Sequence, residues 1–469
     1  MFASFSAPSV CGRGAARLAA VTLASGLAVG TAAATAGPAA AGTAPAHAQG
    51  GATATIGGLK TYGAAVVHSA EGDLEISAGL FELSVEGGGM LQTYCVDIHN
   101  PTQKDAKYHE TSWSGTSLGA NQDAGRIRWI LQHSYPQVND LASLAKKAGV
   151  RGGLSEQDAA AGTQVAIWRY SDGVDVDAVD PEAEKLADYL EKNARDAAEP
   201  KASLTLDPPA ISGHPGGLLG PVTVRTDADS VTVVPPADTL TRGVRVVGAD
   251  GEEVTTARDG SRLYFQVPAD TADGSAELTV QASTTVPVGR AFASETRSQT
   301  QILAGSSEST VTATASATWA ETGAIPALSA AENCAEGGVD ITAVNEGDAA
   351  FTFELMGAEH TVAAGETRTV TIPLQEDQAY DFTITGPGGY EERFTGVLDC
   401  RTRAGEAAEG GESTQILTQP SPATVGSTTA DVNLAATGSS GTTAAIAGVA
   451  IGLVVIGGAA LVLVRKRKS

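Results

Sequence analysis

Two residue types in this sequence can react with each other without a cofactor. They are the thiol of Cys95 and the side-chain amide of Gln164. Thiol attack on a glutamine amide expels ammonia and leaves a γ-glutamyl thioester, whose acyl group an amine or hydroxyl can later take. The surrounding runs are Tyr94-Cys95-Val96-Asp97 and Thr163-Gln164-Val165-Ala166-Ile167-Trp168. The pair predicts an internal thioester between Cys95 and Gln164.

The cysteine count supports this prediction. Cys11 precedes the first apolar run and should leave with the N-terminal segment, so Cys95, Cys334 and Cys400 remain. Cys334 and Cys400 bracket one β-rich segment and are predicted to form a disulfide. Cys95 is then left over, and a thioester would cap its sulfur. The alternatives are a buried free thiol, an intermolecular disulfide and, for Gln164, a solvated helix position.

The elements that must position the pair are a strand and a helix. A strand over 91–98 would place Cys95, Asp97 and His99 on one face. Ser155 with Asp158 forms a capping box that opens the helix carrying Gln164. Alanines precede Gln164 on this helix, and their small side chains would let a strand pack closely against it.

Water can hydrolyse a thioester before the target reacts, so apolar side chains must keep water away from the bond. Tyr94, Trp168, Trp113 and Trp129 are the candidates, although each aromatic residue would equally suit an ordinary core. His99 or His109 is a candidate proton shuttle during acyl transfer, with a plain surface histidine as the alternative.

The two runs resemble the paired motifs of the Cys–Gln thioester domains of Gram-positive surface proteins, over roughly residues 55–200. The resemblance implies an α+β domain, a β-sandwich or barrel with a helical subdomain, which we place at 52–200. It implies a Cys95–Gln164 cross-link, and it implies a covalent binder that reacts once rather than a turnover enzyme. The motif residues around the cross-link are Tyr94, Asp97, Thr163, Ala166 and Trp168.

Both ends of the chain carry processing signals. Residues 1–48 read as a secretory signal peptide, with an apolar run ending in an Ala46-His47-Ala48 cleavage site. Residues 444–464 contain no charge and are long enough as a helix to cross a bilayer core of ~30 Å, and a basic tail follows. The pentapeptide before this helix resembles a sortase sorting signal, within a segment placed at 434–469; a plain single-span anchor is the alternative. The pentapeptide consists of Leu434, Ala435, Ala436, Thr437 and Gly438.

The remaining chain reads as β modules and a linker. Short alternating strands with turn signals predict a β-sandwich over 201–320 and an immunoglobulin-like β-module over 321–400. Residues 401–433 are rich in small and polar residues and predict a flexible, wall-spanning linker. The predicted class is therefore mainly β and multidomain, ending in a C-terminal transmembrane helix.

Composition limits the partners. The 469 residues include 54 acidic and 30 basic side chains, which excludes a basic nucleic-acid-binding surface. No cofactor or metal is predicted, and the head is expected to be monomeric. The composition and sorting signal suit a high-GC Gram-positive bacterium, an actinobacterium.

The predicted function is a secreted adhesin, anchored to peptidoglycan by a sortase. Its thioester would acylate a lysine amine or a hydroxyl on an unidentified surface ligand. One alternative is a secreted thiol peptidase or cell-wall hydrolase, with Cys95 as nucleophile and His109 or His133 as base. The other is a non-reactive structural wall protein.

Overall fold

The computed structural model describes residues 50–70, 72–236 and 242–401. Strands hold 45% of these residues and helices 17%, which confirms the mainly β prediction. Within them no helix combines the length and the apolar character that crossing a membrane requires. The predicted signal peptide, the linker from residue 402 onward, the pentapeptide Leu434–Gly438 and the span 444–464 lie outside the described residues.

The first sheet closes on itself. Its order is β2-β3-β15-β14-β4-β1-β5, and β1 also pairs with β2. Six strands therefore form a ring. The short strand β5 pairs with the C-terminal end of β1, from Ala65 to Val67. The strands are β1 (Thr53–Val67), β2 (Leu74–Val85), β3 (Met90–Cys95), β4 (Lys107–Thr111), β5 (Val176–Ala178), β14 (Ala291–Ser294) and β15 (Gln301–Ser306).

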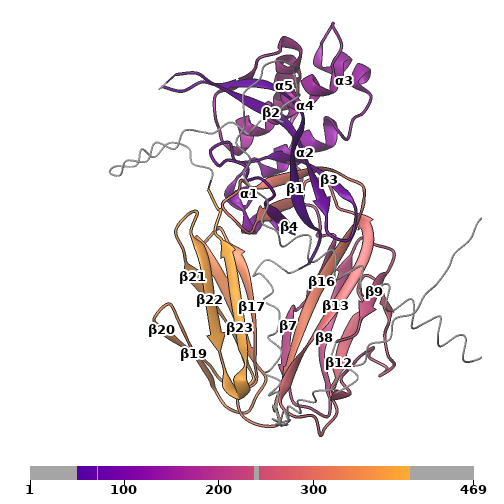
Figure 1. Ribbon diagram of the computed structural model, residues 1–469, viewed down its shortest axis with the longest axis vertical. Coiled ribbons are helices and arrows are strands. Elements are labelled where there is room, and N and C mark those ends of the chain that lie inside the picture. Colours follow the sequence, from indigo (N-terminus) through magenta and orange to yellow (C-terminus); the bar gives the residue numbers. More distant parts are fainter. Residues whose placement is uncertain (1–49, 71, 237–241, 402–469) are drawn as a thin grey trace, which may run out of the picture. The chain divides into compact units, whose positions relative to one another are not determined.

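The helices lie between β4 and the second module in the sequence. Figure 1 shows α2, α4 and α5 gathered beside the β1–β2 strands, and α4 packs against β1, β2 and β3. The capping box predicted at Ser155 and Asp158 is present at the start of α4, and Asp180 caps α5. The elements are η1 (Trp113–Gly115), α1 (Ser117–Ala120), α2 (Ala124–His133), α3 (Leu141–Ala148), α4 (Glu156–Ser171) and α5 (Pro181–Asn193).

The second module consists of two sheets whose strands are mostly antiparallel. One has the order β10-β12-β8-β6 and the other β11-β9-β13-β16-β7. Alternating buried and exposed residues along β8, β9 and β16 place one face of each strand in the core. The strands are β6 (Leu204–Asp207), β7 (Ala210–Gly213), β8 (Leu218–Thr226), β9 (Val231–Val234), β10 (Arg245–Val247), β11 (Thr256–Ala257), β12 (Arg262–Gln266), β13 (Gly274–Thr285) and β16 (Glu308–Trp319).

The sequence predicts a domain boundary at residue 200, but the first sheet includes strands from both sides of it. After β13, the chain supplies β14 to β4 and β15 to β3, and only then returns to the second module as β16. The physical reason is that the ring needs these two strands to join β3 to β4. One continuous hydrophobic core accordingly runs from Ala52 to Trp319.

The third module has its own core, which includes Phe351, Phe353 and Ile341. Cys334 and Cys400 form a disulfide in it. Its strands pair as β17-β18-β21, β19-β20 and β22-β23. The elements are β17 (Pro326–Asn333), β18 (Gly338–Asn345), β19 (Phe351–Leu355), β20 (Ala358–Val362), β21 (Glu366–Pro373), β22 (Ala379–Thr385), η2 (Pro387–Gly389) and β23 (Glu391–Val397).

Candidate functional site: the Cys95–Gln164 pair

The side chain of Gln164 meets the backbone of Cys95. Gln164 Oε1 accepts a hydrogen bond from the Cys95 backbone nitrogen at 3.0 Å, and Gln164 Nε2 donates to the Cys95 carbonyl oxygen at 2.9 Å. Cys95 is 2% exposed and Gln164 is fully buried. The amide that would be attacked therefore lies beside the residue that carries the thiol, away from solvent.

The strand pairing explains why Gln164 binds there. β2 pairs with β3 only as far as Phe81 opposite Thr93, and farther back it pairs with β1 alone, as at Gly79 opposite Tyr62. On that side the N–H and C=O of Cys95 would otherwise lack a strand partner, which is costly in a buried position. The Gln164 amide, with one donor and one acceptor, completes the ladder in place of β2.

Small residues bring α4 close to the ring. A Cβ added at Gly63 of β1 would lie 3.1 Å from Ala161 Cβ of α4. A Cβ added at Gly162 would lie 2.4 Å from the carbonyl oxygen of Ala183 in α5. The alanine run predicted to allow close packing does so on the β1 side, and Gly162 allows it on the α5 side.

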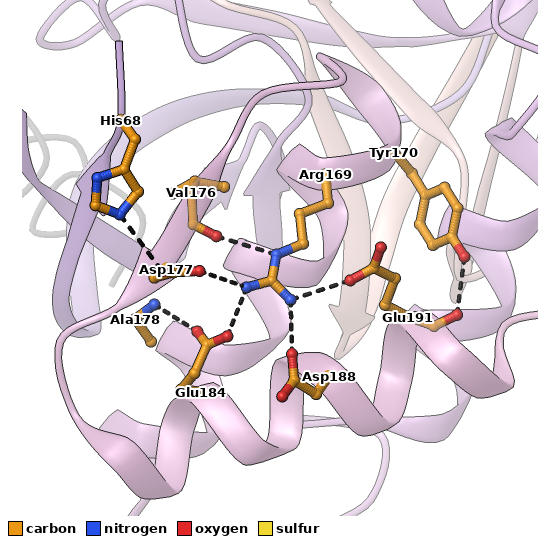
Figure 2. A network of polar contacts seen from close by, with 9 residues as sticks. All are labelled: His68, Arg169, Tyr170, Val176, Asp177, Ala178, Glu184, Asp188 and Glu191. Carbon is orange, nitrogen blue, oxygen red and sulfur yellow. Dashed lines mark hydrogen bonds and ion pairs between the residues drawn. The ribbon is translucent and has the colours of Figure 1, made fainter. Parts of the chain in front are cut away.

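Arg169 fixes the other end of α4 (Figure 2). Its side chain is only 13% exposed, and it points into a cluster of carboxylates contributed by α5 and β5. Nε donates to the Val176 carbonyl oxygen at 3.0 Å. Its ionic partners are Asp177 at 3.0 Å, Glu184 at 2.6 Å, Asp188 at 3.1 Å and Glu191 at 3.0 Å. These contacts join α4 to both neighbours and so hold the helix that carries Gln164.

The chain turns immediately after Cys95. The strand was expected to continue to Ile98, but β3 ends at Cys95. Asp97 Oδ1 accepts hydrogen bonds from the backbone nitrogens of His99 at 2.9 Å and Asn100 at 3.3 Å. This side-chain turn competes with the ladder, so Asp97 and His99 do not share a strand face with Cys95.

A second tie joins this turn to α4. Asp172, the residue that ends α4, accepts a hydrogen bond from the Ile98 backbone nitrogen at 2.9 Å. The end of β3 and the end of α4 are thus held together at a second point besides Gln164. The relative position of Cys95 and Gln164 does not depend on their own contact alone.

Burial disfavours the charged forms of the ionisable groups around the pair. It raises the pKa of the Cys95 thiol to about 12, although hydrogen bonds from Gln301 and Thr102 lower it. Burial also raises the pKa of Asp172 to about 8 and raises the pKa of Asp97. At neutral pH Cys95 is therefore a thiol, and its attack on an amide must rely on proximity and on proton removal during the reaction.

Of the aromatic residues predicted to shield the pair, Tyr94 and Trp168 are both buried. Tyr94 is fully buried and its hydroxyl donates to the Tyr135 carbonyl oxygen at 2.8 Å. Trp168 is 4% exposed and lies one turn beyond Gln164 on α4. Trp113 donates from Nε1 to the Gly289 carbonyl oxygen at 2.8 Å. Trp129 stacks on His133 with 3.9 Å between ring centroids.

The two remaining motif residues support the helix. Thr163 is fully buried, and its hydroxyl donates to the Ala159 carbonyl oxygen at 2.6 Å. Ala166 is fully buried as well. Neither side chain brings a reactive group to Cys95, so both act by letting α4 pack.

The histidines differ in their distance from the pair. His99 is half-buried beside Asp97, and burial lowers its pKa. His109 lies on β4, which is three strands away from β3 in either direction around the six-stranded ring. His133 stacks on Trp129 in α2. In the part of the chain that the structure describes, the hydrogen bonds to the Cys95 sulfur come from Gln301 and Thr102, not from a histidine.

Sequence reasoning missed two features of this site. Gln301 on β15 donates from Nε2 to Cys95 Sγ at 3.3 Å, although it lies outside the predicted domain 52–200. The buried Glu110 binds Arg290 of the same returning segment at 2.9 Å. Only the pairing of β15 with β3 and of β14 with β4 reveals them, because no local motif surrounds Gln301 or Arg290.

A group of carboxylates elsewhere is close enough to share an ion. It consists of Glu376, Asp377 and Asp399, near the end of the described chain. Acidic groups of this kind are common without a metal, and these residues are not part of the Cys95–Gln164 pair.

Two family models match parts of the chain. The thioester domain matches residues 92–196. The C-terminal domain of bacterial phospholipase C matches residues 311–397, which include all the strands of the third module. No curated protein matches the chain.

Three solved structures are similar at low identity. The Bacillus anthracis TIE protein has 16% identity and a TM-score of 0.27; the match covers 74% of this chain and 64% of the other, so this chain spans under two thirds of its length. The thioester domain of the Enterococcus faecium TIE86 protein has 16% identity and a TM-score of 0.27, covering 58% of this chain and 97% of the other. The Escherichia coli chaperone DraB has 13% identity and a TM-score of 0.18, covering 42% and 98%. The chain is thus similar to the thioester domain family over residues 92–196, the segment that contains both Cys95 and Gln164.

Proposed function

We propose that this protein attaches covalently to a target through a Cys95–Gln164 thioester. The observation that carries the proposal is the paired hydrogen bonding of the Gln164 amide with the Cys95 backbone, at 3.0 and 2.9 Å. The thioester domain match over both residues supports it. Gln164 is the acyl donor, and Cys95 is the leaving group.

The bond forms in one exchange. Cys95 Sγ attacks Gln164 Cδ, the Cδ–Sγ bond replaces the Cδ–Nε2 bond, and the thiol proton leaves with ammonia. The Cys95 backbone N–H, which donates to Gln164 Oε1, stabilises the negative charge that develops on that oxygen. Good alignment of two groups lowers such activation barriers by about 7–11 kcal/mol. Folding supplies this alignment, so no cofactor is needed.

The target reaction releases the sulfur. An amine nitrogen or hydroxyl oxygen attacks Gln164 Cδ, the Cδ–Sγ bond breaks, and the nucleophile's proton ends on Cys95. The product is an amide or ester between this protein and its target. Each molecule reacts once, so the protein is a covalent binder and not a turnover enzyme.

Burial selects the nucleophile. Cys95 and Gln164 are almost inaccessible, which slows hydrolysis by bulk water. In this proposal the nucleophile is a slender group, a lysine amine or a hydroxyl, that reaches Gln164 Cδ when the surrounding side chains move apart. The target class is therefore a surface ligand that presents a lysine amine or a hydroxyl.

The setting of this chemistry is the outside of the cell. The signal-like residues 1–48 and the sorting-like run Leu434–Gly438 motivate an exported, wall-anchored adhesin. In this proposal a sortase joins Thr437 to peptidoglycan, and residues 401–433 span the wall. The second and third modules then space the thioester from the anchor.

The experiment is amine capture. The folded protein is incubated with a fluorescent alkylamine, and the labelled peptide is mapped by mass spectrometry. The proposal requires the label on Gln164 and its loss in Cys95→Ala. Label at other glutamines, or equal labelling in Cys95→Ala, would reject it. A protein that turns over peptidoglycan fragments through Cys95 would instead support the hydrolase alternative.

A further inference from the structure

We propose that Gln301 is a catalytic residue of the thioester, and that it stabilises the Cys95 sulfur as the leaving thiolate. The inference rests on the proposed function and assigns a role to a residue outside the segment that matches the thioester domain. Thr93 is its positioning residue. Gln301 and Thr93 are both fully buried.

The contact to the sulfur is direct. Gln301 Nε2 lies 3.3 Å from Cys95 Sγ and donates to it. The Gln164 amide contacts the same residue through the Cys95 backbone. Cys95 thus meets the amide of Gln164 from α4 and a hydrogen-bond donor from β15. Thr102 also hydrogen-bonds the sulfur, but Gln301 is the larger of the two effects on the thiol pKa.

The donor is held in one orientation. Gln301 Oε1 accepts a hydrogen bond from Thr93 Oγ1 at 2.8 Å. With the amide oxygen occupied, Nε2 must face the sulfur. The β3–β15 register places Gln301 opposite Cys95 and diagonal to Thr93, so the strand pairing itself builds the arrangement.

The chemistry needs a donor at this position. When an amine takes the Gln164 acyl group, the Cδ–Sγ bond breaks and its electron pair stays on sulfur until the amine's proton arrives. A thiolate in an apolar core is unfavourable, and burial raises the pKa of the Cys95 thiol to about 12. A fixed N–H donor stabilises the charged sulfur more than the neutral thioester sulfur, so it lowers the barrier. The same donor assists the attacking sulfur when the bond first forms.

The test compares three variants of the full chain. Gln301→Leu keeps the approximate volume and removes the donor. Thr93→Val keeps the shape and removes the group that orients it. Gln92→Leu is the matched control, because Gln92 neighbours Thr93 on β3 and points to the opposite face of the strand. The readout is the rate at which methylamine releases the Cys95 thiol, together with the intact mass.

We expect Gln301→Leu to slow aminolysis about 10- to 100-fold, as for loss of one hydrogen bond to a charged group. Thr93→Val should slow it about threefold or more, by the same mechanism acting through orientation. Gln92→Leu should react like the unaltered protein. Wild-type rates in both Gln301→Leu and Thr93→Val would overturn the proposal.

A second readout separates this inference from the proposed function. In a Gln164→Ala background no thioester can form, and the rate of Cys95 alkylation by iodoacetamide at one pH well below the thiol pKa is proportional to the thiolate fraction. Adding Gln301→Leu should lower that rate, and an unchanged rate would contradict the role of Gln301. If Gln301→Leu fails to fold, Thr93→Val in the same background decides. If the unaltered protein contains no thioester, the proposed function is wrong. The alkylation of Cys95 in the Gln164→Ala background would still test whether Gln301 stabilises the thiolate.

Discussion

Gln164 Oε1 lies 3.0 Å from the backbone nitrogen of Cys95, in the place where a neighbouring strand would otherwise pair. A buried backbone donor and a reactive carbonyl thereby satisfy each other. Because the donor is a main-chain N–H, side-chain substitution at Cys95 removes the nucleophile and leaves this contact. Cys95→Ala is therefore a clean variant for every test of the chemistry.

The buried pair of Glu110 and Arg290 gives the first prediction. Glu110 is fully buried, binds Arg290 Nε at 2.9 Å and accepts from the Ser203 backbone nitrogen at 2.9 Å. Arg290 also binds Glu199 at 2.9 Å, so Glu110→Ala removes one of its two carboxylates and leaves the buried Ser203 nitrogen without its acceptor. We expect a loss of about 3 kcal/mol in the free energy of unfolding. Chemical denaturation measures it.

The control for Glu110 is an exposed pair in the same sheet. Lys107 and Glu86 lie 3.0 Å apart with about half of each side chain exposed, at 54% and 53%. Lys107→Ala should cost at most about 1 kcal/mol. Equal effects of the two substitutions would mean that Arg290 does not depend on Glu110.

Gly162 gives the second prediction. Alanine in a helix is ordinarily favoured over glycine by about 1 kcal/mol. Here the new Cβ would lie 2.4 Å from the Ala183 carbonyl oxygen, so Gly162→Ala must push α4 and α5 apart. We expect a lower melting temperature and slower thioester formation. A rise in melting temperature would show that α4 and α5 leave enough space at Gly162 for a methyl group.

Asp172 gives a pH prediction. Burial raises its pKa from 3.8 to about 8, so the folded state binds a proton that the unfolded state releases above pH ~4. Stability is therefore full below the unfolded pKa and declines as pH rises towards 8, by about 1.4 kcal/mol per pH unit for one proton. Asp172→Asn keeps an acceptor for Ile98 and removes the ionisation. Its unfolding free energy should be flatter over this range, and an unchanged slope would refute the assignment.

The disulfide gives a prediction for the third module. Cys334 and Cys400 close a loop of 66 residues. In the chain-entropy model this constraint contributes about 4 kcal/mol, so Cys334→Ser with Cys400→Ser should lower the unfolding transition of that module. Methylamine should still act on the head. Loss of amine reactivity in this variant would show that the thioester depends on the third module.

Much of the site follows from the sequence because it is encoded locally. The orphan Cys95, the capping box at Ser155 and the alanines before Gln164 are short-range signals, and the structure places Cys95 against Gln164. The extent of β3 was misjudged because the Asp97 side chain competes with the strand ladder. That competition is decided by a side chain two residues away, not by the alternating pattern.

The remaining features are encoded by long-range pairing. Gln301 reaches Cys95 only because β15 pairs with β3, and Arg290 reaches Glu110 only after the chain has left the second module. Strand periodicity gives which residues face inward but not which strand lies beside which. A single sequence therefore predicts that Cys95 and Gln164 belong together and misses Gln301, which donates to the sulfur.

The most direct test of the account is the intact mass of the folded, unreduced protein. The account predicts a mass lower by one ammonia than the sequence requires, no titratable Cys95 thiol, and restoration of both by methylamine. Cys95→Ala and Gln164→Ala should each show the full expected mass. A full mass in the unaltered protein, with a Cys95 thiol that alkylates under denaturing conditions, would contradict the thioester and with it covalent attachment.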